Sequence, residues 1–156
     1  MSKKKTDLFG LIFCDAQVID LDFSEWDKQI RLCVVGLDVE SPTPNRLPLF
    51  TIDFKRVTHF SCMFNHLDIQ LDNQCHHFQW NIHDFRKHKV RDNLQIELIG
   101  SGASPRIEIT CEGYDISPLS HAALDSLFPG WDKPFGPLAR LGIEAMAFKQ
   151  QINKNN

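Results

Sequence analysis

The chain contains a single tyrosine, against twelve phenylalanines and three tryptophans. Because phenylalanine offers no hydrogen bond, this aromatic set favours a packed core over a platform on which nucleic-acid bases stack. The chain also lacks an excess of either charge, since 17 basic and 20 acidic residues leave a net charge of −3. A charge this close to zero creates no field that attracts nucleic acid or an anionic membrane. We therefore expect neither of these as a partner.

Long hydrophobic runs are also missing, and no run approaches the roughly 18 residues that a membrane-spanning helix needs. Near the N-terminus, Lys3, Lys4 and Lys5 precede the apolar residues 8–13, a pattern that imitates an export signal. That apolar run is only about six residues, shorter than the apolar region of a secretory signal. Bulky Phe13 also stands where a signal cleaved before Cys14 would need a small residue. We therefore expect a cytoplasmic protein.

The five cysteines are an odd number and follow no spacing that would suggest a disulfide framework. Two of them, Cys33 and Cys111, fall within alternating strand patterns, where a free cysteine behaves as a small hydrophobic residue. A reducing compartment suits this set better than a disulfide-stabilised secreted fold.

Alternation of apolar and polar residues is the main structural signal in the first two thirds of the chain. It predicts strands over residues 18–23, 30–37, 48–54, parts of 57–71, 78–82, 94–98 and 107–111. Residues 86–93 are polar and are expected to connect two strands. The short intervals between strands favour an antiparallel meander over strand–helix–strand units. We expect Phe50, Ile52, Trp80 and Ile96 to be buried on the inner face of this sheet.

After Tyr114 the pattern becomes helical. We expect a short helix over residues 121–128 capped by Ser120, and a last helix that starts near Pro137. One apolar face of that last helix comprises Leu138, Leu141, Ala145, Phe148 and Ile152. The prediction is one domain over residues 1–156, with a β-rich part (8–116) and a helical C-terminal part (117–153). The fold class is α+β: a curved antiparallel sheet of about six or seven strands with C-terminal helices packed on it.

Histidine and cysteine side chains are densest between residues 59 and 77, where we find His59, Cys62, His66, Cys75, His76 and His77. A structural zinc site needs four converging ligands in paired spacings, and these residues match such spacings poorly. We expect no metal and no cofactor, with Cys62, His66, Cys75 and His77 as the alternative metal set. A cysteine–histidine enzyme remains a second alternative, because such partners meet in space rather than in sequence.

Several surface features are candidates for binding. Asp20 and Asp22, with Asp27, form an acidic strip on the first hairpin; Arg86, Lys87 and Lys89 form a basic run; Trp131 and Phe135 lie in a loop rich in proline and glycine. Each has a plainer alternative: the charged groups as a solvated surface, and the two aromatic rings as packing at the edge of the core. Asp15, just before the first strand, is expected to accept backbone hydrogen bonds.

Two apolar residues of the last helix, Ile143 and Met146, lie off its main apolar face. At 100° per residue one packed face cannot easily bury both sets. A symmetric homodimer is the common way to cover such a surface, and we expect these two residues at its interface.

The opening residues Asp15-Ala16 and Val18 resemble small bacterial β-rich domains described as immunity-protein-like or YxiG-like. The segment Phe54-Lys55-Arg56-Val57-Thr58-His59-Phe60 is similar to the exit of the third strand in that family, and residues 78–82 and 94–98 are similar to its closing strands. The resemblance covers roughly residues 12–117. Cys14 stands where the family has histidine, so only Asp15 is carried over. The resemblance implies a β-rich module that acts by binding, with neutralisation of a toxin as one form.

The sequence thus favours a non-enzymatic, cytoplasmic protein-binding module, with inhibition of a bacterial toxin as its sharpest version. The alternatives are an enzyme or metal protein that uses the histidine and cysteine set, and a protein that binds a small ligand on the sheet.

Overall fold

The computed structural model describes residues 7–24, 26–37, 39–40, 48–63, 80–100, 104–129, 131, 141 and 144–153. In this part of the chain the elements are α1 (Leu8–Phe13), β1 (Ala16–Ser24), β2 (Gln29–Gly36), β3 (Leu49–Lys55), β4 (His59–Met63), β5 (Trp80–Val90), β6 (Asn93–Gly100), β7 (Arg106–Cys111), β8 (Gly113–Pro118), α2 (His121–Leu127) and α4 (Ala145–Asn153). The predicted antiparallel sheet with a few helices is confirmed, although it has eight strands rather than six or seven.

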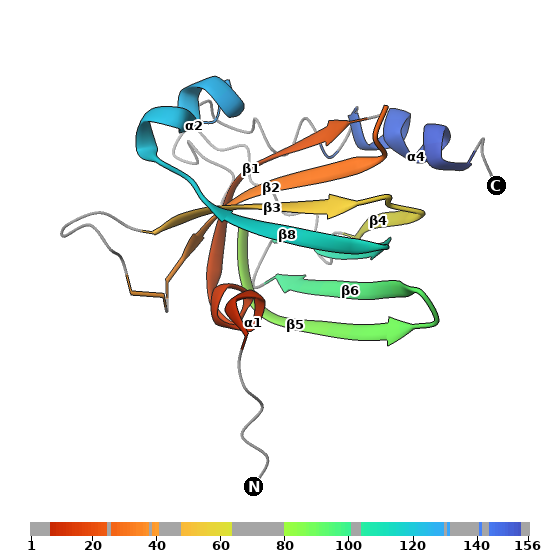
Figure 1. The fold of residues 1–156 in the computed structure, drawn as a ribbon, viewed down its shortest axis with the longest axis horizontal. Helices are drawn as coiled ribbons and strands as arrows, with labels where there is room; N and C mark the ends of the chain where they lie inside the picture. Colours follow the sequence, from red (N-terminus) through yellow and green to blue (C-terminus); the bar gives the residue numbers. More distant parts are fainter. Residues whose placement is uncertain are drawn as a thin grey trace, which may run out of the picture.

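The eight strands form one sheet in the order β4-β7-β6-β5-β1-β2-β3-β8. The edge strands are β4 and β8. Each is the continuation of a strand near the other edge: β3 continues into β4 after a short bend, and β7 continues into β8 after Glu112. β3 pairs with β8 and β4 pairs with β7. The ladder persists through the bend, where Glu112 N donates to Lys55 O at 3.0 Å and Thr58 N donates to Thr110 O at 2.8 Å. The β3–β4 and β7–β8 segments therefore form one long, bent pair of strands, and the sheet curls around its inner face (Figure 1).

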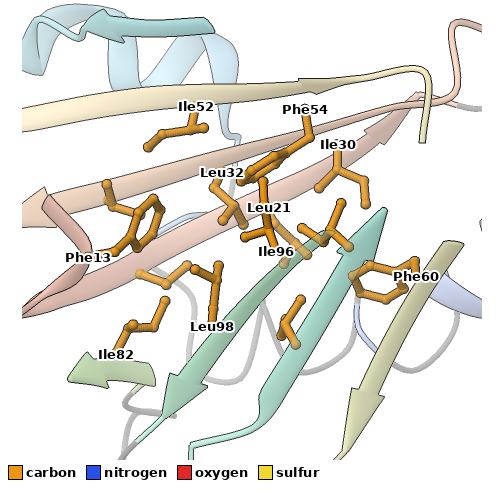
Figure 2. Packing of buried hydrophobic residues seen from close by; sticks show 14 of the residues in the cluster. Phe13, Leu21, Ile30, Leu32, Ile52, Phe54, Phe60, Ile82, Ile96 and Leu98 are labelled. Atoms are coloured by element: carbon orange, nitrogen blue, oxygen red, sulfur yellow. The ribbon is translucent and has the colours of Figure 1, made fainter. Parts of the chain in front are cut away.

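The main hydrophobic core lies inside this curled sheet. Leu21, Leu32 and Ile52 of β1–β3 point toward Ile82 and Leu98 of β5 and β6 (Figure 2). An antiparallel sheet with one apolar face must cover that face, and here one half of the sheet covers the other. The residues predicted for the inner face are all buried, which confirms that prediction: Phe50, Ile52, Trp80 and Ile96.

Helices cover the remainder of the core at opposite ends of the strands (Figure 1). α1 lies where β1 begins and buries Phe9, Ile12 and Phe13. α4 lies where β1 ends, and the ring of its Phe148 is 5.2 Å from that of Phe23. The predicted apolar face of the last helix is confirmed for the residues that the structure places: Leu141, Ala145, Phe148 and Ile152.

α2 covers a second, smaller core on the outer face of the sheet. This core comprises Cys33, Val35, Leu49, Leu124 and Phe128. The predicted cap of α2 is confirmed, because the Ser120 hydroxyl accepts a hydrogen bond from Ala123 N at 3.1 Å. The outer face of β2 and β3 is therefore apolar near α2.

The prediction that residues 86–93 form a connection is wrong. β5 continues to Val90, and the turn to β6 comprises only Arg91 and Asp92. The alternation was hidden because Lys87 occupies an inward-facing position, opposite Ile96. Its long stem lies along aromatic rings while its ammonium group stays polar, so a lysine fills a place that usually takes an apolar residue.

Two elements were not predicted, α1 and β8. α1 has six residues, too few for helical periodicity to show, and it is stabilised by burial of its side chains in the core. β8 begins directly after the bend at Glu112 and directs Tyr114 and Ile116 toward the core. The β-rich part therefore extends to Pro118 rather than ending at residue 116.

Ile96→Ala tests the register of the sheet. Ile96 is 2% exposed in the main core, so we expect the substitution to lower the free energy of unfolding by about 2–5 kcal/mol. Ile99 of the same strand points to the outer face and is the matched control, for which we expect a loss below about 1 kcal/mol. Urea unfolding of both variants measures the difference. A loss below about 1 kcal/mol for Ile96→Ala, with the larger loss at Ile99, would mean that the register is shifted by one residue.

Candidate functional site

The turn between β1 and β2 is held firmly in place. The strands stay paired up to Ser24 and Gln29. In the turn, Lys28 has a left-handed backbone with φ of 50°, and its carbonyl oxygen accepts a hydrogen bond from Val57 N at 2.8 Å. Because Val57 belongs to the bend between β3 and β4, the turn is anchored to a neighbouring part of the sheet. We call residues 24 and 26–29 the hairpin tip.

Trp26 of the hairpin tip is 95% exposed, whereas Trp80 is completely buried. Scattered apolar residues on a surface need no explanation. A tryptophan side chain, however, has a larger apolar area than most side chains, so leaving it in water costs more free energy. Such rings are the most frequent anchors at protein–protein interfaces. In the sequence, Trp26 falls in the connection between the predicted strands 18–23 and 30–37, and the alternation pattern gives it no binding role. The available signal was a large aromatic residue in a tight connection between strands, where the fold's own core cannot cover it.

A hollow of about 230 Å³ lies beside the tip, lined by Asp22, Ser24, Asp27, Gln29 and Arg31. Arg31, which also lines the hollow, donates to Asp53 through hydrogen bonds of 2.7 and 3.3 Å, and its charge also acts on Asp22, its neighbour across the strand pair. The pairing with Asp53 raises the pKa of Arg31. Asp22 and Asp27 form no ion pair within the part of the chain described above. The hollow therefore combines two carboxylates with the guanidinium group of Arg31.

Asp20, predicted on the same acidic strip, is not on the surface. A bulge interrupts the pairing between Val18 and Asp20, and the Asp20 side chain is only 1% exposed. Its Oδ1 accepts a hydrogen bond from Leu21 N at 2.8 Å. It lies opposite Cys33, whose pKa is raised to about 12 by burial and by the charge of Asp20. Asp20 therefore belongs to the packing of the outer face, and the prediction that it forms part of an exposed acidic strip is wrong.

The expected role of the Asp15 side chain is also wrong. Asp15 is exposed in the bend before β1, and it is its backbone carbonyl that accepts a hydrogen bond, from Leu37 N at 3.1 Å. The side-chain role falls to Asp7, whose Oδ1 accepts a hydrogen bond from Gly10 N at 2.9 Å and caps α1.

The basic run does not form one patch, because successive side chains of a strand point to opposite faces. Arg86 lies on the outer face beside Glu97, while Lys87 faces inward and Lys89 is exposed near the end of the strand. The Lys87 ammonium donates to Asp7 Oδ2 at 2.8 Å and to the Tyr114 hydroxyl at 2.7 Å. Lys87 thus fastens α1 to the sheet, and this explains its place better than partner binding does.

The remaining residues predicted for binding or for a dimer interface are Trp131, Phe135, Ile143 and Met146. Trp131 packs against the smaller core and donates from Nε1 to Asp125 Oδ1 at 2.6 Å, so it is pinned rather than presented to a partner. Phe135 and Ile143 lie outside the described residues. Met146 is 63% exposed on α4, and the proposed dimer contact through Ile143 and Met146 stays a prediction.

The structure describes only two members of the predicted histidine and cysteine set, and it places them on opposite faces of β4. His59 is exposed on the outer face of β4, whereas Cys62 packs against the core. Burial raises the pKa of Cys62 and of Cys111 to about 11, so these two thiols stay protonated at neutral pH. Across the described ranges, no three histidine, cysteine or acidic side chains are close enough to hold a metal. His66, Cys75 and His77 lie outside those ranges, so the alternative metal set is not tested.

A second hollow, of about 370 Å³, lies on the outer face of β4–β7. One row across four paired strands contributes His59, Thr110, Gln95 and His88. Below this row, Glu97 pairs with Arg106, and Glu108 accepts a hydrogen bond from the Ser61 hydroxyl at 3.4 Å. The hollow is therefore polar, and both of its carboxylates, Glu97 and Glu108, already have partners.

Comparison with known proteins adds little to this geometry. No family model and no curated protein matches the chain. A solved structure of an uncharacterized protein from Neisseria gonorrhoeae is similar, with 15% sequence identity and a TM-score of 0.46 over 69% of this chain and 95% of that one. None of the helices that the structure places is long and apolar enough to span a membrane.

Lys87→Met tests the attachment of α1. The substitution keeps an apolar stem but removes both hydrogen bonds of the ammonium group. Because Asp7 is more than half exposed, we expect a modest loss of about 1–2 kcal/mol in the free energy of unfolding. Lys89→Met, two residues along the same strand, is the control and should change stability by less than about 0.5 kcal/mol. If both variants lose the same amount, the contacts of Lys87 contribute nothing specific.

The pH dependence of the same variant gives a second test. The hydrogen bond from Lys87 lowers the pKa of Asp7 below its ordinary 3.8, so the stabilisation is complete above that value and is lost as the pH falls through the lowered pKa. Burial acts to lower the pKa of Lys87, but its bonds to Asp7 and Tyr114 outweigh this and raise it above 10.5. The difference between wild type and Lys87→Met should therefore narrow in strong acid and again in strong alkali. A difference that is constant with pH would contradict the ion pair.

Alkylation with iodoacetamide at neutral pH tests whether any thiol is activated. We expect the exposed Cys14 to react first, and Cys33, Cys62 and Cys111 to react only after unfolding, because burial raises the pKa of each of these three. Mass spectrometry of native and urea-unfolded samples identifies the labelled residues. Rapid labelling of Cys62 in the native protein would favour the cysteine enzyme instead.

Proposed function

We propose that this chain is a non-enzymatic protein-binding module that contacts its partner with the hairpin tip and the hollow beside it. The observation that carries this proposal is Trp26, 95% exposed on a turn whose backbone is anchored to the β3–β4 bend. Burial of one tryptophan side chain at an interface removes a large apolar area from water. Because the backbone of Lys28 is already anchored to the β3–β4 bend, binding loses less conformational entropy than it would at an unanchored turn.

The sharpest form of the proposal is a cytoplasmic inhibitor of a bacterial toxin. The resemblance of the segment around Asp15 to immunity-type domains supports this form. The hollow beside the hairpin tip holds two carboxylates, Asp22 and Asp27, and one cation, Arg31, which is itself paired with Asp53; this excess of negative charge supports a partner with a basic surface. Complementary charge of this kind speeds encounter and excludes wrong partners, which an inhibitor of a toxin requires.

A second candidate, binding of a small polar ligand, rests on the hollow formed by the row from His59 to His88. It is ranked lower because no phenylalanine, tyrosine or tryptophan lines that hollow, and because the two carboxylates below the row already have partners. Ligand pockets usually combine an apolar lining with a few polar groups. A solvated sheet face explains the same residues.

Site-specific crosslinking in cells of the source organism tests the proposed function. A photoreactive phenylalanine replaces Trp26 in one variant and, as the control on another hairpin, Val90 in a second; both side chains are exposed. We expect one discrete protein adduct from position 26 and none of the same mass from position 90. Absence of an adduct at 26, or the same adducts at both positions, would contradict the proposal.

The protein identified in that adduct is then purified and titrated. Truncation of a central aromatic anchor typically costs at least about 2 kcal/mol of binding energy, so we expect Trp26→Ala to weaken binding by roughly thirtyfold without a change in melting temperature. For the inhibitor form, the partner should stop growth when it is expressed alone and lose this effect when it is co-expressed with the wild-type chain. A partner that does not stop growth would leave the protein-binding function standing but would rule out the form in which the chain inhibits a toxin.

A further inference from the structure

We infer that the free edge of β8 receives an extended segment of another protein, which pairs with β8 through backbone hydrogen bonds and adds a strand to the sheet. This goes beyond the proposed function, because that function rests on the hairpin tip. β8 stands at the end of the strand order and pairs with β3 on one side. In the part of the chain that the structure places, no strand pairs with its other side.

The ladder between β3 and β8 shows which backbone groups face this free edge. Leu119 N donates to Leu49 O at 2.9 Å, and these two residues extend the β3–β8 register by one pair. In an antiparallel ladder, pairs that exchange hydrogen bonds alternate with pairs that do not. Counted back from this bonded pair, the backbone groups of Tyr114 and Ile116 point away from β3. Within the described ranges, no backbone group bonds to them there.

The position of Pro118 obeys the same alternation. It lies opposite Phe50, in a pair that exchanges no hydrogen bond, so its missing N–H falls on the free edge and costs the β3–β8 ladder nothing. The edge therefore presents the N–H and C=O groups of Tyr114 and Ile116, followed by a lone carbonyl group. Alternating donors and acceptors at this spacing are matched by the backbone of another extended strand.

The devices that usually protect a sheet edge are missing from the middle of β8. Edges are commonly protected by a bulge, a proline, an inward-pointing charge or a covering helix. The β3–β8 register is regular, the inward-facing Tyr114 and Ile116 are uncharged, and proline occurs only at the last position. The charged side chain of β8, Asp115, is paired with Lys55 of β3. α1 contacts β8 through Phe9, whose ring lies 4.7 Å from that of Tyr114. The backbone edge of β8 is therefore open to pairing.

A second copy of this chain fits the edge poorly. If Tyr114 pairs with Ile116 of the copy, the two Asp115 side chains lie directly opposite each other, and like charges in that position destabilise a sheet. If Ile116 pairs with Ile116, each Tyr114 faces Pro118, whose missing N–H leaves a carbonyl oxygen unbonded. If Tyr114 pairs with Tyr114, the ladder runs into the bend at Glu112. The occupant that avoids these penalties is a segment of another protein, with an uncharged or basic residue opposite Asp115.

Hydrogen exchange of the free protein, followed by ¹⁵N NMR, tests whether the edge is open. After correction for intrinsic rates, we expect the amides of Tyr114 and Ile116 to exchange at least about tenfold faster than those of Asp115 and Ser117, because only the latter two donate to β3. Equal protection of all four amides would show that the edge is already paired, for example with another segment of this chain, and would overturn the inference.

Crosslinking in cells of the source organism tests the occupant. A photoreactive phenylalanine replaces Ser117, exposed on β8, or, as a control, Gln95, exposed on β6 between two paired strands. The adduct from position 117 is then compared between Ile116→Pro and Ile116→Ala. Both variants replace the isoleucine side chain, but only proline removes the outward N–H. We expect proline to lower the adduct yield at least about tenfold relative to alanine, since one backbone hydrogen bond is lost and a carbonyl group is left unmatched.

The two variants should have similar melting temperatures, because the Ile116 N–H does not donate to β3. If Ile116→Pro does not fold, the crosslinked peptide is identified by mass spectrometry, synthesised and added to the labelled wild-type protein. Binding should then protect the amides of Tyr114 and Ile116 from exchange, and their continued rapid exchange would contradict the pairing.

Three results of the crosslinking would overturn the inference: no adduct specific to position 117, an adduct made of two copies of this chain, or equal yields from Ile116→Pro and Ile116→Ala. None of them depends on what position 26 captures, so the proposed function and this inference can fail separately.

Discussion

The structure depends on one bent pair of strands. The ladder between the β3–β4 segment and the β7–β8 segment continues through a bend at which Lys55 and Thr110 still accept backbone hydrogen bonds. Because the pairing does not stop there, the sheet curls and each half covers the apolar face of the other. Arg56, at the bend, has a left-handed backbone with φ of 49°, a conformation that costs free energy for a non-glycine residue and needs surrounding structure to hold it. The core on the inner face provides that support.

The same bend determines what the surface can do. Val57, one residue beyond Arg56, donates the hydrogen bond that anchors the tip of the β1–β2 hairpin. A change in the bend would therefore release Trp26 and the turn around it. On the outer face, the α2 end of β2 and β3 is covered by apolar packing, while the opposite end is left polar beside the hairpin tip. The hairpin tip is thus both anchored to the bend and exposed, and a residue that anchors a binding partner needs both properties.

Much of the fold follows from the alternation of residues, because the buried positions of the central strands are ordinary apolar residues. The segments that failed are those in which another interaction replaced the pattern. Lys87 fills an inward-facing position through its contacts with Asp7, Phe9 and Tyr114, and a polar residue there conceals the strand. α1 is too short to show a period, and its stability comes from the core that it covers. No local rule could assign either element without the tertiary contacts.

The candidate site was predicted only in part, again for physical reasons. Asp22 was identified as part of an acidic strip, but the bulge before Asp20 removes that residue from the surface, and a bulge leaves no reliable trace in one sequence. The charge of the hollow depends on the Arg31–Asp53 pair, which joins residues far apart in the chain. Trp26 could have been identified from the sequence, since a tryptophan in a predicted turn is visible without any contact information.

The central claim is that Trp26 is presented on an ordered turn rather than on a flexible one. Backbone ¹⁵N relaxation of the free protein measures this most directly, because the order parameter reports motion of each amide on the picosecond to nanosecond scale. The account predicts values of about 0.85 for Trp26, Asp27 and Lys28, equal to those of the paired strands on either side. Values below about 0.6 for these three amides would mean that the turn is flexible, and would contradict the account of a preorganised binding anchor.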